Sequence, residues 1–257
     1  DIPLPSILNS EEDWMTIQIA MHGSDGILLA GDTQQRDPLK LRGQYWQEGR
    51  EGRNSTKIKI DYDQRIAISC AGDMNTSGYI ADNLRLAFKA NGMSDPIKTI
   101  QQIMATVPPF NRTGAKCLVV LPERRLFSVK TMHNIIQNDV VVPEWFPVCQ
   151  EEQSAAVAGD DISAALFWLE KHYDGINKLP IKQLIPLAAH LVVCANQLNP
   201  KWISGLEIVL CDSDGVNHLS RESIDDLEKK AREWDQTISN LFASYNPQYT
   251  HAPKTNN

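Results

Sequence analysis

The sequence predicts an α+β fold in which two antiparallel β-sheets lie between two pairs of helices, a four-layer αββα sandwich. Three observations predict it. Runs of alternating apolar and polar residues occur in pairs that flank turn residues, as in β-hairpins. Segments with apolar residues at helical spacing follow one another in pairs. The order along the chain is strands, two helices, strands, two helices and a strand, so that each sheet has a helix pair to cover its outer face.

Strands are expected where apolar residues alternate and Gly, Asp or Pro residues bound the run. The first hairpin turns at residues 22–26, where Gly and Asp tolerate the positive φ of a tight turn. The segment 33–56 is polar and rich in glycine, and we expect it to be a long loop. The expected strands are residues 15–21, 27–32, 57–61, 65–71, 117–121, 126–132, 154–158 and 206–211.

Helices are expected where apolar residues recur three or four positions apart: residues 77–90, 96–106, 162–172, 181–197 and 223–242. The last of these helices has Ser223 as its expected N-cap and acidic residues in its first turn, where the helix dipole is positive. Two interpretations of its apolar seam stay open. The seam packs against the body of the domain, or it contacts a neighbouring subunit.

Composition restricts the classes of function. The chain has 257 residues, of which 42% are hydrophobic and 22% charged, as is ordinary for a soluble globular protein. The net charge of −7 argues against a nucleic-acid partner. No apolar run reaches the roughly 18 residues needed to span a bilayer, so we expect no membrane partner. Five dispersed cysteines argue against a disulfide framework or a zinc site and favour a reducing, cytoplasmic compartment.

Three residues indicate chemistry most directly: Thr16, Asp32 and Lys57. Each lies at one end of an expected strand, and we expect the three strands to be neighbours in one sheet. Taken singly, each residue has an ordinary structural interpretation: a strand threonine, a turn aspartate and a solvated lysine. Together, a hydroxyl, a carboxylate and an amine can form an activated nucleophile.

With the strand order, these residues resemble the proteasome β-subunit family and its bacterial two-ring protease relatives, which are N-terminal-nucleophile (Ntn) hydrolases. The resemblance covers roughly residues 15–211. It includes Cys-Ala-Gly-Asp at 70–73, Ala-Gly-Asp at 158–160 and Ser-Gly-Leu-Glu-Ile-Val at 204–209. The interval of sixteen residues from Thr16 to Asp32 matches the family. The interval of 25 residues from Asp32 to Lys57 is longer than usual and indicates an insertion.

The resemblance implies an Ntn-hydrolase fold and a threonine peptidase that uses no metal or organic cofactor. Thr16 would be the nucleophile and would carry the acyl group, with its own free α-amine as the base. Lys57 would lower the pKa of the hydroxyl and the amine, and Asp32 would hold Lys57 in place. Ser204 is the candidate for holding the threonine amine.

The resemblance also places the oxyanion donor among the backbone N–H groups from Ser69 to Ala71, where one such donor is typically worth ~3 kcal/mol. Two residues depart from the family pattern. Asp160 stands where the family commonly has Ser, and Lys201 stands where it commonly has Asp. Either these two form an ion pair that restores a positioning network, or the network has decayed.

We expect a leader-like segment at residues 1–15, the Ntn domain at 16–220, and a C-terminal helix and tail at 221–257. Thr16 follows Met15, so its nitrogen lies in a peptide bond. Self-cleavage before the threonine, usually after Gly, frees the amine in the family; initiation at Met15 would free it too.

The expected function is hydrolysis of peptides or unfolded proteins inside homo-oligomeric rings. Two alternatives stay open: a catalytically inactive ring or scaffold subunit, and a related Ntn amidase that acts on small amides outside a ring.

Overall fold

The structure is a computed structural model. It describes residues 16–34, 40–42, 45–47, 56–72, 74–107, 116–132, 135–137, 140–142, 146–159, 178–198, 200 and 203–244. The expected leader 1–15 and the expected helix 162–172 lie outside the described residues.

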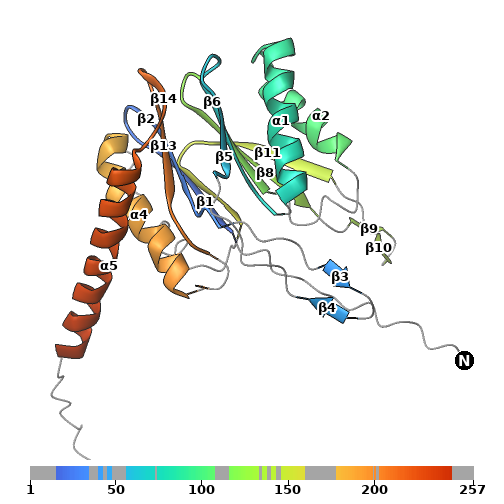
Figure 1. The fold of residues 1–257 in the computed structure, drawn as a ribbon. Helices are drawn as coiled ribbons and strands as arrows, with labels where there is room; N and C mark the ends of the chain where they lie inside the picture. The colour runs from blue at the N-terminus through green and yellow to red at the C-terminus, as the bar shows by residue number, and fades with distance from the viewer. Residues whose placement is uncertain are drawn as a thin grey trace, which may run out of the picture.

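Two five-stranded antiparallel sheets form the centre of the fold (Figure 1). The first has the order β12-β1-β2-β13-β14 and consists of β1 (Ile17–His22), β2 (Gly26–Gly31), β12 (Ala155–Gly159), β13 (Glu207–Asp212) and β14 (Gly215–His218). The second has the order β11-β8-β7-β6-β5 and consists of β5 (Ile58–Asp61), β6 (Ile66–Ala71), β7 (Lys116–Leu121), β8 (Arg125–Met132) and β11 (Phe146–Glu152). Two short hairpins pair β3 (Lys40–Arg42) with β4 (Tyr45–Gln47), and β9 (Ile135–Gln137) with β10 (Val140–Val142).

Alternation along β1 explains how its sheet packs on both faces, because successive strand side chains point to opposite sides. Ile19 and Met21 belong to the core cluster that contains residues of helix α4 (Ile181–Leu198). Ala20, between them, belongs to the cluster that it shares with Leu118 and Val120 of the second sheet. The two sheets therefore face each other across an apolar layer.

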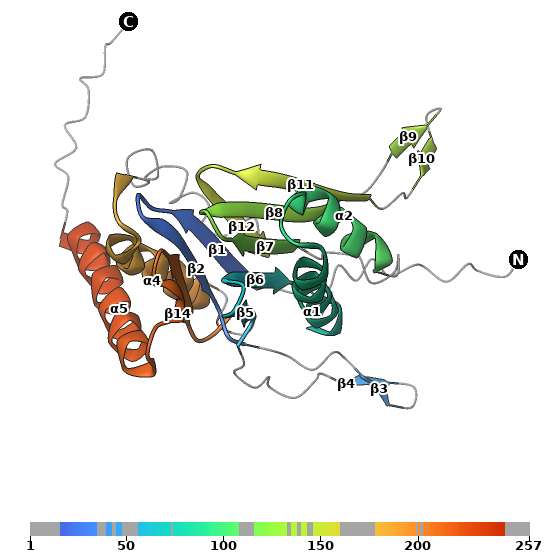
Figure 2. The ribbon, with the colours of Figure 1, turned by 90° about the horizontal axis from the view of Figure 1, so that it is seen from above.

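The helices lie on opposite sides of the sheet pair (Figures 1 and 2). Helix α4 packs against β1, β2 and β13, and α5 (Arg221–Ser244) packs against α4. On the other side, α1 (Met74–Asn91) contacts β6, and α2 (Pro96–Thr106) contacts β11 and α1. The predicted α+β class with two antiparallel sheets is confirmed. Within the part of the chain that the structure describes, none of the helices has the length and apolar character that a membrane span requires.

Several elements differ from the sequence-based expectation. Strands β3 and β4 lie within the expected loop 33–56. Strand β11 was not predicted, and it contains Pro147, which lacks an N–H; as the edge strand of its sheet, β11 tolerates this residue. Helix α5 begins earlier than expected, because Ser220 is its cap: the Ser220 hydroxyl oxygen accepts the N–H of Ser223 at 3.2 Å.

Candidate functional site

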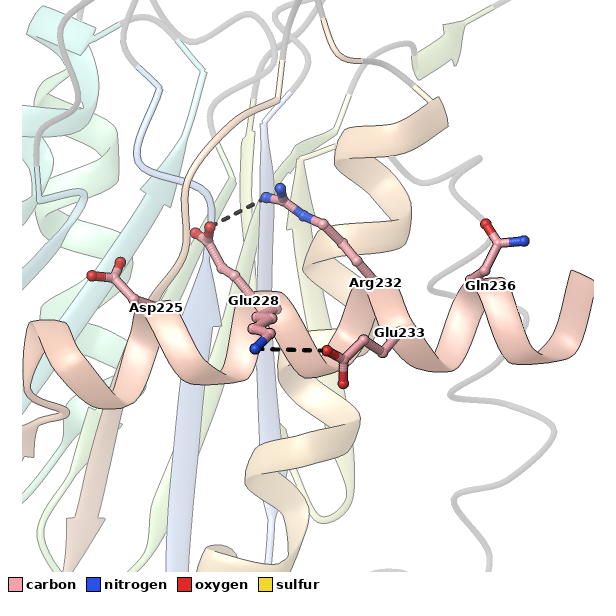
Figure 3. Close-up of a pocket in the computed structure, with 6 residues that line it drawn as sticks. Asp225, Glu228, Arg232, Glu233 and Gln236 are labelled. Atoms are coloured by element: carbon pink, nitrogen blue, oxygen red, sulfur yellow. Dashed lines mark hydrogen bonds and ion pairs between the residues drawn. The ribbon is translucent and has the colours of Figure 1, made fainter.

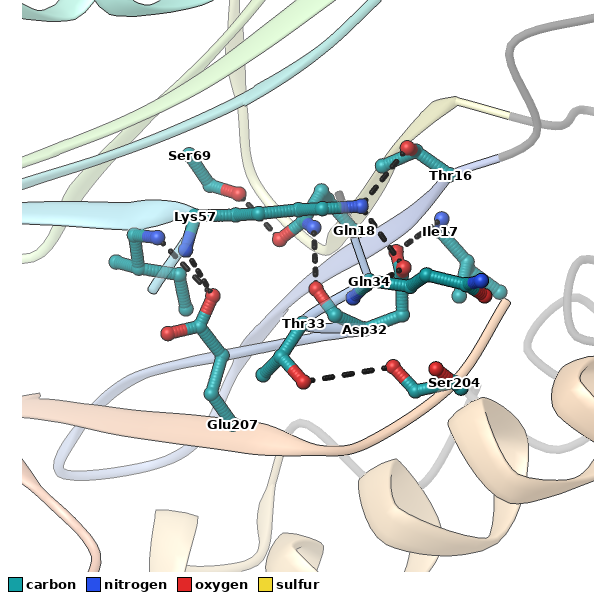
Figure 4. Close-up of polar contacts among 11 residues, drawn as sticks. Thr16, Ile17, Gln18, Asp32, Thr33, Gln34, Lys57, Ser69, Ser204 and Glu207 are labelled. Carbon is teal, nitrogen blue, oxygen red and sulfur yellow. Dashed lines mark hydrogen bonds and ion pairs between the residues drawn. The ribbon is translucent and has the colours of Figure 1, made fainter. Parts of the chain in front are cut away.

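Thr16, Asp32 and Lys57 converge at one end of the two sheets (Figure 4). The Lys57 ammonium donates to Thr16 Oγ1 at 3.0 Å and to Asp32 Oδ2 at 2.8 Å. The side chain of Asp32 is fully buried, and that of Lys57 is 8% exposed. A hydroxyl, a carboxylate and an ammonium therefore form one hydrogen-bonded chain.

The expectation that the three residues adjoin neighbouring strands of one sheet was wrong. Thr16 precedes β1 and Asp32 follows β2, which are partners in the first sheet, but Lys57 precedes β5 at the edge of the second. The site thus spans the two sheets. Alternation of apolar residues cannot reveal this, because it identifies strands without saying which strands pair.

The Asp32 carboxylate is held by three donors. Oδ1 accepts the N–H of Ile17 at 3.0 Å, and Oδ2 accepts the N–H of Gln34 at 3.2 Å in addition to Lys57. Burial raises the pKa of Asp32 above its ordinary value, and the Lys57 ammonium and the two N–H groups act in the opposite direction. These donors compensate the buried negative charge and fix its position beside Lys57.

Next to the site, a buried hydrogen bond between the side chains of Ser69 and Gln18 links the two sheets. The hydroxyl of Ser69, on β6, donates to Gln18 Oε1, and Gln18 Nε2 donates to the carbonyl oxygen of Asp32 at 3.5 Å. Both side chains are almost completely buried. Ser69 therefore contributes its side chain to the support of Asp32, a role that the sequence did not indicate.

The predicted oxyanion segment runs along β6. Ser69 is paired on both sides, with Ile58 of β5 and Leu118 of β7, so its N–H belongs to the sheet. Ala71 is paired with Lys116 of β7 and lies beyond the end of the β5 ladder. Successive residues direct their N–H groups to alternate edges, so one of the two residues after Ser69 turns its N–H towards the edge that β5 has left.

Ser204 contacts the segment that follows Asp32. Its carbonyl oxygen accepts the N–H groups of Thr33 at 3.0 Å and Gln34 at 3.1 Å, and the Thr33 hydroxyl at 3.4 Å. Its suggested contact with the threonine amine stays a prediction. Asp160 and Lys201 lie outside the described residues, so the suggested ion pair between them also stays a prediction.

Gly159, at the end of β12, packs directly against the backbone of Thr16. Its φ is +106°, and a Cβ added there would lie 1.7 Å from the Thr16 carbonyl oxygen. The Lys116 ammonium donates to the carbonyl oxygen of Gly159 at 2.9 Å, across from the other sheet. The position of the Thr16 backbone therefore depends on the absence of a side chain at residue 159.

Sequence reasoning missed Glu207 as a site residue. Glu207 begins β13, and its Oε1 accepts the N–H groups of Lys57 at 2.7 Å and Ile58 at 3.1 Å. Burial raises the pKa of Glu207 to about 8, and the two N–H groups and the Lys57 ammonium oppose this shift. An acidic residue inside the apolar run 206–211 was the signal available in the sequence.

A hollow on α5 is lined by charged and polar side chains, among them Asp225, Glu228 and Arg232 (Figure 3). Arg232 pairs with Glu228 at 3.3 Å and Lys229 with Glu233 at 3.9 Å, all within the helix. Exposed pairs at this spacing contribute about 0.3–0.5 kcal/mol each. The hollow is an ordinary solvated helix face, and we assign it no function. Across the described residues, no group of three or more His, Cys, Asp or Glu side chains could hold a metal ion.

No protein-family model and no curated protein matches the chain. Solved structures of Anbu proteins match the chain. Anbu (ancestral beta-subunit) from Yersinia bercovieri matches with a TM-score of 0.61 at 11% identity, over 92% of this chain and 100% of that chain. Anbu from Hyphomicrobium sp. strain MC1 matches with a TM-score of 0.61 at 9% identity, over 91% and 100%. The helical assembly of the Anbu complex from Pseudomonas aeruginosa matches with a TM-score of 0.58 at 12% identity, over 94% and 100%.

These likenesses show that the chain shares the fold of the Anbu proteins. They also correct the family suggested by the sequence. The resemblance to the proteasome β-subunit family was wrong, because the matching structures are Anbu proteins, which are proteasome-like but distinct, and no family model supports it. The spacing of the residues used for that resemblance follows from the lengths of the strands and turns between them. Such spacing indicates a type of fold, and it does not distinguish one family within that fold from another.

Proposed function

We propose that this chain is an Ntn-type threonine peptidase with the four-layer αββα arrangement. The observation that carries the proposal is the contact between the Lys57 ammonium and Thr16 Oγ1 at 3.0 Å, with Asp32 bound to the same ammonium at 2.8 Å. A threonine hydroxyl is a weak nucleophile, and a neighbouring cation that is itself held by a carboxylate stabilises its deprotonated form.

In the proposed reaction, the α-amine of Thr16 takes the hydroxyl proton while Oγ1 attacks the carbonyl carbon of the scissile peptide bond. The new C–O bond moves an electron pair onto the carbonyl oxygen, where an N–H at the Ala71 end of β6 would donate to it. Collapse of this intermediate breaks the C–N bond, and the leaving amine receives the proton. Water then hydrolyses the ester on Thr16 and restores the hydroxyl.

This mechanism requires a free α-amine on Thr16. In the printed sequence Met15 precedes Thr16, so the amine becomes free only when the chain starts at Thr16. We propose that residues 1–15 are a leader whose removal activates the site, that residues 16–220 form the catalytic domain, and that residues 221–257 form a helix and tail. A non-catalytic assembly subunit is the second candidate. The peptide bond between Met15 and Thr16 favours it, because this bond leaves Thr16 without a free α-amine.

We also propose that identical copies of the chain assemble. The Anbu complex from Pseudomonas aeruginosa is described as a helical assembly, and this chain shares its fold. In a closed or helical assembly the sites would face an enclosed space, and peptides or unfolded segments would be the substrates that enter. The five cysteines are all free thiols, which fits a reducing cytoplasmic compartment.

The test is the mass of the purified protein combined with hydrolysis of a fluorogenic peptide library. A species that begins at Thr16 and hydrolyses peptides, with activity lost in Thr16→Ala, supports the peptidase. A chain that keeps residues 1–15 under all conditions and never hydrolyses a peptide supports the assembly subunit. Hydrolysis by Thr16→Ala at the wild-type rate would show that another group is the nucleophile.

A further inference from the structure

We propose that Glu207 is a positioning residue that holds the backbone of Lys57, so that the Lys57 ammonium reaches both Thr16 and Asp32. This inference rests on the proposed function, because it concerns how the same site is kept in order. It assigns a role to a buried carboxylate that takes no part in the reaction described above.

The start of β5 takes a hydrogen-bond acceptor from outside its own sheet. Strand β5 is the edge of its sheet, so its outer side has no strand partner within that sheet. The N–H groups of Lys57 and Ile58 both reach Glu207 Oε1, at 2.7 Å and 3.1 Å. Buried N–H groups without an acceptor are costly, and this carboxylate supplies the acceptor from the opposite sheet.

The register of the first sheet brings Glu207 close to Asp32. Glu207 of β13 lies opposite Gly31 of β2, and Asp32 is the next residue along the chain. One end of the first sheet therefore presents two carboxylates to Lys57: Asp32 binds the ammonium, and Glu207 binds the main-chain nitrogen. Lys57 is held at both ends, and Figure 4 shows the two carboxylates reaching it from below. A flexible four-carbon side chain held only at its tip would leave the ammonium less well placed.

The charges around Glu207 agree with a neutral, hydrogen-bonding role. The charged groups that face it are Lys57 at the start of β5 and Asp32 at the end of β2. Burial raises its pKa to about 8, so a large share of the carboxyl groups carry a proton at neutral pH. Protonation leaves one oxygen able to accept both N–H groups, while Lys57 and Asp32 balance each other's charge. A glutamine at this position would keep the acceptor.

The experiment compares Glu207→Gln and Glu207→Leu, expressed from the full sequence, with Glu152→Leu as the matched control. Amide exchange is measured on the whole protein, and turnover is measured on the species that begins at Thr16, because only that species has the free α-amine. Glu152 ends β11 and accepts the Ser128 hydroxyl, and its carbonyl oxygen contacts His22, at the other end of β1 from Thr16. Two readouts are followed: amide hydrogen exchange of the peptide that contains Lys57 and Ile58, and kcat and KM for peptide hydrolysis.

In Glu207→Leu we expect exchange of the two amides to accelerate by about tenfold or more. We expect kcat to fall about 100-fold with KM little changed, because the ammonium is displaced from the reacting hydroxyl. Glu207→Gln should keep slow exchange and most of kcat, and Glu152→Leu should leave both readouts as in the wild type.

Wild-type exchange and wild-type kcat in Glu207→Leu would overturn the proposal. A folded Glu207→Gln variant that loses as much kcat as Glu207→Leu would overturn it too, because the charge and not the acceptor would then matter. Amide exchange needs no turnover, so it tests Glu207 even if the wild-type protein hydrolyses no peptide, a result that would count against the proposed function alone.

Discussion

A methyl group added at Gly159 tests the placement of Thr16 directly, because it would meet the Thr16 backbone. Gly159 has a φ of +106° and is paired with Ile17 at the start of β1. The Cβ of Gly159→Ala would lie 1.7 Å from the carbonyl oxygen of Thr16 and 2.7 Å from its carbonyl carbon. Backbone atoms cannot rotate away as a flexible side chain can, so Thr16 and residue 159 have to move apart.

The size of the movement follows from the geometry. Because Cβ atoms essentially never approach another heavy atom within 3.0 Å, the two groups must separate by at least 1.3 Å. The hydrogen bond from Lys57 to Thr16 Oγ1 is 3.0 Å long and would not survive a displacement of that size unchanged. A misplacement of about 1 Å in a reacting group can cost about 100-fold in rate. The positive φ adds about 1–3 kcal/mol of backbone strain.

The matched control is Gly215→Ala. Gly215 also has a positive φ, +131°, but a Cβ there would meet no atom within 4 Å, and the residue lies at the other end of the first sheet. Gly215→Ala should lose about 1–3 kcal/mol of unfolding free energy in urea titrations, from its positive φ alone. Gly159→Ala should lose more, because the clash with the Thr16 backbone adds to the same strain. Only Gly159→Ala should lose about 100-fold in kcat/KM. Equal kcat/KM for the two variants would refute the idea that the Gly159 contact sets the position of the nucleophile.

Three further predictions concern the site residues themselves. Thr16→Ala should abolish peptide hydrolysis and change the free energy of unfolding by no more than about 1 kcal/mol, since it removes two small groups; a larger change would mean that Thr16 is structural. Lys57→Ala should be inactive and should lose about 3–5 kcal/mol in urea unfolding, because it leaves the Asp32 carboxylate buried without its cation. The double variant with Asp32→Asn should lose less, and an equal loss would contradict the pairing. The raised pKa of Glu207, about 8 against an ordinary 4.5, means that the folded chain holds this proton more tightly than the unfolded chain. Between these pH values the unfolding free energy of the wild type should therefore fall relative to Glu207→Gln as pH rises, by at most about 5 kcal/mol, and a difference that does not vary with pH would contradict it.

Much of the fold follows from local patterns in the sequence. Apolar runs bounded by turn residues identified β1, β2 and β6. Strands β2 and β6 are almost continuously apolar, because a strand that packs on both faces needs apolar residues at nearly every position. Apolar residues three or four positions apart identified α2 and α4, because residues at that spacing share the face of a helix that packs against the protein. These patterns are properties of neighbouring residues, so they can be read without knowing the partners of each element.

The candidate site depends on contacts between distant segments. The sequence singled out Thr16, Asp32 and Lys57, but it placed them on one sheet, whereas the structure has Lys57 reaching across from the second. It gave no role to Glu207, which is separated from Lys57 by 150 residues and whose side chain accepts the backbone N–H of Lys57. Every residue except proline carries the same backbone N–H, so the residue type does not indicate such a contact.

The chemical character of the site, a hydroxyl beside a carboxylate and an ammonium, thus follows from the chain order and the residue types. Its geometry comes from the packing of one sheet on the other, which brings the end of β2, the start of β5 and the start of β13 together. The physical reason is the distance along the chain over which each kind of interaction acts. Periodicity reflects interactions over a few residues, while the distance between Lys57 and its partners is the result of all the apolar contacts between the sheets.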